Sequence, residues 1–190
     1  MNQVEIFDLL KRSGVIMEGH FLLTSGRHSD RFLQCSKLLQ YPESSAAVCR
    51  MMASPFINNG IETVIGPAMG GVILSYETAR ALGARAVYAE KEGERMVLRR
   101  GFSLRAGEKV LVVEDAVSTG GSVQKVIDLL TAVKAEIVGV AVIVDRTAGL
   151  FDPGIPVKAL LEMAIESYDP NDCPLCRAGI PLQKPKEGAL

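Results

Sequence analysis

The spacing of apolar residues along the chain alternates between two periods, one typical of helices and the other of buried strands. Helical spacing and helix-ending residues predict four helices, over residues 4–12, 43–58, 70–82 and 122–134, of which the last is clearly amphipathic. Short, nearly continuous apolar or β-branched runs predict four strands, over residues 61–66, 84–89, 109–114 and 136–144. Helices that alternate with such strands predict an α/β fold, in which helices cover both faces of a parallel, doubly wound sheet.

Length and composition are those of one globular domain. The chain has 190 residues, 48% hydrophobic and 23% charged, so we expect a single domain over residues 1–190. A net charge of −1 argues against a general binder of nucleic acid or anionic membranes, which would carry a basic excess. Because no apolar run approaches the ~20 residues of a membrane span and the N-terminus lacks a signal-peptide layout, we expect a soluble, cytoplasmic protein.

The cysteines do not form the framework of a secreted, disulfide-bonded fold, because the chain has only four and they are scattered. Cys173 and Cys176 make a single CxxC pair, whereas a structural zinc site needs four ligands. His20 and His28 are far from this pair in the sequence. We therefore interpret the pair as a tight turn in the C-terminal tail, with a redox pair or a zinc ion shared across a dimer as alternatives, and assign no certain metal ligand.

The stretch VLVVEDAVSTGGS, residues 110–122, carries the strongest chemical signal. A buried strand ends in two carboxylates, Glu114 and Asp115, and a turn of small and hydroxyl residues leads into an amphipathic helix. Glycines in such a turn let backbone N–H groups approach an anion, hydroxyls donate hydrogen bonds, and the helix N-terminus adds positive potential. In open α/β sheets ligands bind at the carboxyl ends of strands, so residues 118–122 predict a phosphate-binding turn.

The acidic pair narrows the ligand to a phosphorylated pentose. The turn lacks the Gly-Lys-Ser/Thr of a nucleoside-triphosphate P-loop, and no GxGxxG follows a strand as in dinucleotide-binding domains. Carboxylates accept hydrogen bonds, so two of them beside a phosphate-binding turn suit a vicinal diol. The implied ligand is a ribose 5-phosphate. The alternative is a capped strand-to-helix turn whose two acids are solvated.

This stretch resembles the signature of the type I phosphoribosyltransferases, which bind 5-phospho-α-D-ribose 1-diphosphate. The resemblance implies that Glu114 and Asp115 hold the ribose hydroxyls and favour the cationic sugar ring electrostatically during catalysis, and that residues 118–122 hold the 5-phosphate. It also implies a flexible hairpin loop and a small hood, built from about residues 1–40 and the C-terminal tail. The sugar-diphosphate site is then Glu114, Asp115, Ala116, Val117, Ser118, Thr119, Gly120, Gly121 and Ser122.

Further segments look like those of the orotate phosphoribosyltransferases. Residues 20–32 are similar to the segment that covers the base, and residues 65–71 to the loop that contacts pyrophosphate. Residues 144–147, VDRT, match the place where these enzymes hold orotate with an arginine. This makes Arg146 the candidate partner of the orotate carboxylate, because its planar fork suits bidentate binding. Ser118 would contact the edge of the base, and the ending CPLC…GIPLQKP resembles one subgroup of these enzymes.

The chain also departs from the usual pattern of that family. Thr24 and Met69-Gly70 stand where many members carry lysine, and the loop over residues 90–105 has no histidine. Lys91 and Arg95 are the candidate catalytic cations of this loop, with Arg99 and Arg100 as further sources of positive charge. A solvated β-hairpin of mixed charge is the alternative interpretation of the segment.

The resemblance implies transfer of the phosphoribosyl group to orotate, giving orotidine 5′-phosphate and diphosphate in de novo pyrimidine biosynthesis. It further implies Mg²⁺ on the diphosphate, with few ligands from the protein, and a homodimer in which the 90–105 loop reaches the neighbouring site. A purine-type phosphoribosyltransferase and a non-catalytic sensor of the sugar diphosphate are alternatives. A plain nucleotide-binding or dehydrogenase-like domain would lack its fingerprint here.

Overall fold

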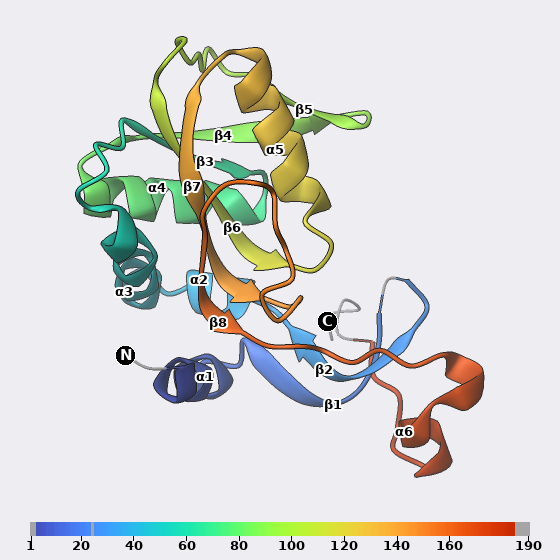
Figure 1. The fold of residues 1–190 in the computed structure, drawn as a ribbon. Coiled ribbons are helices and arrows are strands. Elements are labelled where there is room, and N and C mark those ends of the chain that lie inside the picture. Colours follow the sequence, from blue (N-terminus) through green and yellow to red (C-terminus); the bar gives the residue numbers. More distant parts are fainter. Residues whose placement is uncertain (1–2, 24, 185–190) are drawn as a thin grey trace. The chain divides into compact units, whose positions relative to one another are not determined.

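The computed structural model describes residues 3–23 and 25–184, and the chain forms two compact units (Figure 1). The larger unit is residues 39–163; the smaller combines residues 1–38 with residues 164–190, as far as they are described. Thr24 and the last residues of the predicted hood, 185–190, lie outside the described part. That the chain ends act as a hood therefore stays a prediction.

The larger unit is built on a six-stranded sheet with the order β5-β4-β3-β6-β7-β8. All neighbouring strands are parallel except β5, which pairs antiparallel with β4 at one edge. The strands are β3 (Thr63–Pro67), β4 (Arg85–Glu92), β5 (Arg95–Leu98), β6 (Lys109–Val117), β7 (Glu136–Asp145) and β8 (Val157–Glu162).

Helices cover both faces of this sheet, because alternate residues of its central strands point to opposite sides. Helix α5 (Gly121–Ala132) buries Val126 and Leu130 in a cluster with Val110 and Val112 of β6. The intervening Leu111 is also fully buried and so faces the other layer. That layer holds α3 (Pro42–Ala53), the 3-10 turn η1 (Ser54–Phe56) and α4 (Gly70–Leu82). The predicted parallel, doubly wound sheet is confirmed.

The four predicted strands and four predicted helices are all present, and the described residues form four further strands. β6 continues three residues beyond its predicted end and so contains the acidic pair. The sequence does not predict β1 (Ile16–Leu22), β2 (His28–Leu33) or β8, whereas β5 lies in the segment 90–105, for which a β-hairpin is the alternative interpretation. They are half-exposed or rich in charged residues, so they lack the apolar run that marks a central strand.

The smaller unit joins the β1–β2 hairpin to the C-terminal segment. Along the chain, the β1–β2 hairpin follows α1 (Gln3–Arg12) and precedes α2 (Ser36–Leu39). The chain passes into the larger unit at α2. The C-terminal segment carries the 3-10 turn η2 (Pro170–Asp172) and the short helix α6 (Pro174–Arg177). Backbone bridges join Phe21 to Gln183 and His28 to Tyr168.

In the described part of the chain, no helix has the length and apolar character needed to cross a membrane.

Candidate active site

The topology of the sheet creates a crevice between β3 and β6. After β3 the chain adds β4 on one side of that strand, then returns to add β6 on its other side. The connections that leave the carboxyl ends of β3 and β6 therefore run in opposite directions, which is where open α/β sheets bind ligands. The start of α4 closely approaches the end of β6, since a Cβ atom on Gly70 would lie 3.1 Å from Asp115 Oδ2.

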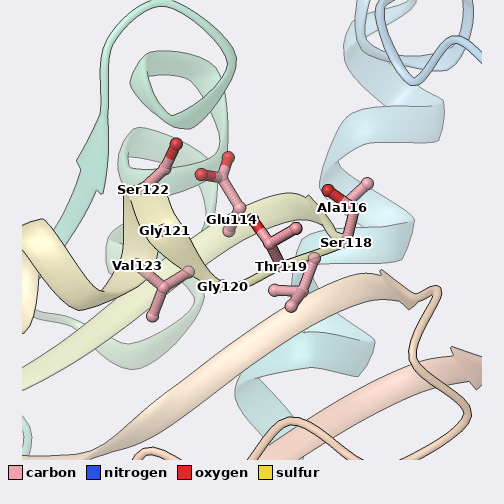
Figure 2. Close-up of a pocket in the computed structure, with 9 residues that line it drawn as sticks. Glu114, Ala116, Ser118, Thr119, Gly120, Gly121, Ser122 and Val123 are labelled. Atoms are coloured by element: carbon pink, nitrogen blue, oxygen red, sulfur yellow. The ribbon is translucent and has the colours of Figure 1, made fainter. Parts of the chain in front are cut away.

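A pocket lies at the end of β6 and around the first turn of α5 (Figure 2). Ser118, Thr119 and Ser122 are exposed there. The first backbone N–H groups of a helix have no partner within the helix, so they are free to bind an anion. The residues that line the pocket are Glu114, Ala116, Val117, Ser118, Thr119, Gly120, Gly121, Ser122 and Val123.

Gly120 shapes the turn that leads into α5. Its φ of +76° lies in the left-handed region, and a Cβ atom there would come within 2.0 Å of the ring of Phe151. Only glycine satisfies both conditions. The backbone N–H of Gln124 donates to the Gly120 carbonyl at 2.8 Å, which anchors the first helical turn behind the pocket.

The two carboxylates differ in environment. Glu114 is buried, with 7% of its surface exposed, whereas Asp115 is half-buried. Burial, reinforced by the charge of Asp115, raises the pKa of Glu114 to about 8. The backbone N–H of Asp115 donates to Glu114 Oε1 at 3.0 Å, and that of Ala116 donates to Asp115 Oδ1 at 2.7 Å. These two backbone bonds hold the acidic pair near the carboxyl end of β6.

Arg146 follows β7 and joins the same end of the sheet. Its backbone N–H donates to the carbonyl of Val117 at 2.8 Å, which fixes it beside the last residue of β6. Its side chain is half-buried, and its Nε is buried without a hydrogen-bond partner within the described residues. Burial lowers the pKa of the guanidinium, which nevertheless stays charged. A buried, unpaired donor of this kind is suited to a carboxylate ligand.

Comparison with known proteins identifies the family of the chain. Residues 34–171 match the phosphoribosyl transferase domain model. The orotate phosphoribosyltransferase of Desulforamulus reducens is 50% identical over 185 residues, covering 97% of each chain. That of Thermotoga maritima is 51% identical, covering 97% of this chain and 99% of the relative. The chain belongs to the orotate phosphoribosyltransferase family.

A solved structure supports the same assignment. The crystal structure of orotate phosphoribosyltransferase from Aeropyrum pernix superimposes with a TM-score of 0.70 at 25% identity, covering 82% of this chain and 92% of that one. The family and fold predicted by the resemblance are therefore confirmed, as is membership of a class of pentosyltransferase enzymes. The roles of individual residues rest on the geometry of this chain.

The structure does not bring the candidate catalytic cations of this family member into the pocket. Residues 90–105 begin in an antiparallel β4–β5 hairpin. Lys91 is exposed there, opposite Met96. Arg95 pairs with Glu92 at 2.5 Å, and Arg99 reaches the same carboxylate at 2.6 Å.

Arg100 is likewise engaged, pairing with Glu90 at 2.8 Å. Of the described residues, those that line the pocket are all at positions 114 and 116–123. The catalytic roles of Lys91 and Arg95 thus stay predictions. To reach a substrate in the pocket, both side chains would have to leave their present surroundings. Exposed ion pairs of this kind are weak, because solvent screens the charges.

Two residues that support the site were missed from the sequence. Asp145 is buried at the end of β7, and its carboxylate accepts bonds from the Thr147 N–H at 2.7 Å and the Gly149 N–H at 3.1 Å. It thereby fixes the turn that carries Arg146. A carboxylate that ends a buried strand, as in the run VIVDRT, was a usable signal. The packing of Phe151 on Gly120 had no local signal.

Proposed function

We propose that this chain transfers the phosphoribosyl group of 5-phospho-α-D-ribose 1-diphosphate to orotate, forming orotidine 5′-phosphate and diphosphate in pyrimidine biosynthesis. The observation that carries the proposal is the pocket at the end of β6, where an acidic pair adjoins the exposed hydroxyls and the first turn of α5. The membership of the chain in the orotate phosphoribosyltransferase family supports it.

The 5-phosphate and the ribose of the sugar diphosphate would each have a partner in this pocket. Residues 118–122 would hold the 5-phosphate with backbone N–H groups and hydroxyls, and Glu114 and Asp115 would accept hydrogen bonds from the ribose hydroxyls. As the bond from C1 to the diphosphate breaks, positive charge grows on the ribose ring. The two carboxylates would then stabilise that charge more strongly than they stabilise the ground state.

Orotate would bind against Arg146 and the edge of Ser118. The buried Nε of Arg146 is a donor without a partner in the described structure, and the orotate carboxylate would supply one. Orotate carries its charge on the carboxylate. As its ring N1 bonds to C1 of the ribose, the N1 proton would leave to water or to the departing diphosphate, so Glu114 and Asp115 are not assigned as general bases. Their part is to hold the sugar and its charge.

The donor set at the end of β6 fits Mg²⁺. Glu114 and Asp115 supply carboxylate oxygens, and the raised pKa of Glu114 reflects burial beside a like charge, which a cation would relieve. Magnesium commonly takes one or two carboxylates and completes its coordination with water and substrate phosphates. When bound, it would neutralise charge on the leaving diphosphate.

The remaining parts of the proposal concern the hairpin and the assembly. Lys91 and Arg95 would exchange their present surroundings for the diphosphate, adding positive charge and excluding water that would hydrolyse the sugar. A homodimer would let the hairpin of one chain serve the site of its partner. We place the enzyme in the cytoplasm.

An ultraviolet absorbance assay tests this function directly. Purified protein with the sugar diphosphate and Mg²⁺ should consume orotate and release diphosphate, and should not consume adenine, guanine or hypoxanthine. Consumption of a purine in place of orotate would identify the purine-type alternative. Tight binding of the sugar diphosphate without turnover of any base would identify a sensor.

A further inference from the structure

Four potential metal ligands from distant parts of the chain gather in the smaller unit. His20 lies on β1, His28 begins β2, and Cys173 and Cys176 flank the start of α6. Their ligand atoms all lie within 4.8 Å of one another. Both thiols are free rather than joined as a disulfide. The histidines and cysteines are about 150 positions apart, so only the fold brings them together.

The spacing of these atoms matches a tetrahedral zinc site. Zinc bonds of about 2.3 Å to sulfur and 2.0–2.1 Å to nitrogen place neighbouring N and S ligands about 3.5 Å apart. Cys173 Sγ lies 3.6 Å from His20 Nε2, and Cys176 Sγ lies 3.8 Å from it and 3.3 Å from His28 Nδ1. The two ring nitrogens are 2.9 Å apart, so a small outward movement would admit the ion.

The tautomer of His20 is already set for metal binding. Its Nδ1 lies 2.7 Å from the backbone carbonyl of Ile180, which can only accept, so Nδ1 carries the proton. Nε2 is then left with a lone pair that faces the two sulfur atoms and His28. A histidine ligand held through its other nitrogen by a carbonyl is the usual arrangement around protein-bound zinc.

Burial makes this cluster a closed site. His20 and Cys173 are each 1% exposed and His28 is 6% exposed, while Cys176 lies at the surface. Two sulfur and two nitrogen donors in tetrahedral spacing select zinc over magnesium or calcium, which prefer oxygen. Because the protein would supply all four ligands, no position remains for water or substrate, and the site would be structural.

We propose that His20, His28, Cys173 and Cys176 bind one structural zinc ion, which joins the β1–β2 hairpin to the C-terminal segment. Backbone bonds flank the cluster, with the Gln183 N–H donating to the His20 carbonyl at 2.7 Å and the Tyr168 N–H to the His28 carbonyl at 2.7 Å. The ion would close a loop of about 150 residues, where a cross-link removes much conformational freedom from the unfolded chain.

Elemental analysis of protein purified without chelators tests the proposal. We expect one zinc ion per chain. After removal of zinc, added Co²⁺ should give the intense visible bands of tetrahedral cobalt and a thiolate charge-transfer band. Protein that folds and binds the sugar diphosphate, yet holds no zinc and gives no such cobalt spectrum, would overturn the proposal.

Matched cysteine variants locate the ion. Cys176→Ser should lose the zinc and the thiolate band, whereas Cys49→Ala, which removes a buried thiol from the larger unit, should keep both. A strong chelator should lower the melting temperature of the wild type and of Cys49→Ala but leave that of Cys176→Ser unchanged. Retention of stoichiometric zinc by Cys176→Ser would contradict the assignment, whatever the effect on stability.

Discussion

A buried glutamate lies near each end of strand β6, and the surroundings of the two glutamates shift their pKa values in opposite directions. Glu108, just before the strand, accepts bonds from Thr63 Oγ1 at 2.5 Å and Arg85 Nη2 at 2.8 Å. Burial alone would raise its pKa, but these bonds and one from the Arg105 N–H lower it overall. At the other end, burial and a neighbouring carboxylate raise the pKa of Glu114 to about 8.

The difference between the two pKa shifts distinguishes a glutamate that stabilises the fold from one that is placed to bind a ligand. At Glu108 the fold supplies donors for a buried charge, as stability requires. At Glu114 the fold places a second acid, Asp115, beside the first and offers no ion pair among the described residues. Such an arrangement costs stability unless a ligand completes it, so the carboxyl end of β6 is built for a partner that arrives from solution.

The largest expected effect is on catalysis at the carboxyl end. Asp115→Asn should lower kcat by about a hundredfold or more, because it removes a charge placed where the sugar becomes cationic. Its free energy of unfolding should change little, since Asp115 is half-buried and the Asn side chain keeps an oxygen that can accept the bond from the Ala116 N–H. Steady-state kinetics and urea unfolding check the two statements. Full activity with normal saturation by the sugar diphosphate would contradict the role.

Arg146→Ala should weaken the binding of orotate more than the binding of the sugar diphosphate. Loss of a charge-assisted bond of about 1.5–3 kcal/mol raises the KM for orotate by about 10- to 150-fold, while the KM for the sugar diphosphate should change little. Initial rates measured with each substrate varied in turn give both constants. Equal weakening of the two substrates would show that Arg146 supports the site as a whole.

Glu108→Gln tests whether the glutamate at the start of β6 serves stability alone. The variant keeps the shape but loses the charge that Arg85 contacts, so the free energy of unfolding should fall by about 1–3 kcal/mol. Near-normal kcat and KM for the remaining folded protein are expected. A loss of turnover as large as that of Asp115→Asn, without a loss of stability, would contradict the assignment of a structural role to Glu108.

The last expected effect is on pH dependence. Glu114 must ionise to accept bonds from the ribose, so affinity for the sugar diphosphate should rise with pH up to about 8, by at most about tenfold per unit. The folded-state pKa lies above the ordinary 4.5, so the contribution of Glu114 to stability is complete below 4.5 and is lost as pH rises to about 8. Glu114→Gln should flatten both profiles, as calorimetric titration and thermal unfolding would measure.

The central sheet could be predicted because its strands are buried on both faces and therefore appear as apolar runs. The acidic pair and the glycine-rich turn are contiguous in the sequence, so the pocket could be predicted with them. Arg146 needed a family resemblance to be noticed, because its approach to β6 depends on strand pairing. The β1–β2 hairpin has no such run, since charged and polar residues interrupt it.

The cluster of His20, His28, Cys173 and Cys176 shows why contacts between distant parts of the chain could not be predicted from the sequence. His20 and His28 lie about 150 positions before the CxxC pair, so the sequence alone does not place them in one site with it. The register of β1 and β2 brings them together, and the return of the C-terminal segment adds the cysteines. Contacts between residues about 150 positions apart leave no periodic trace in the sequence.

A crystal structure with ribose 5-phosphate tests the central claim most directly. The phosphate should lie within hydrogen-bond distance of the backbone N–H groups of residues 118–122, and the ribose hydroxyls should contact Glu114 and Asp115. Sugar bound at another place, with the turn before α5 empty, would contradict the account.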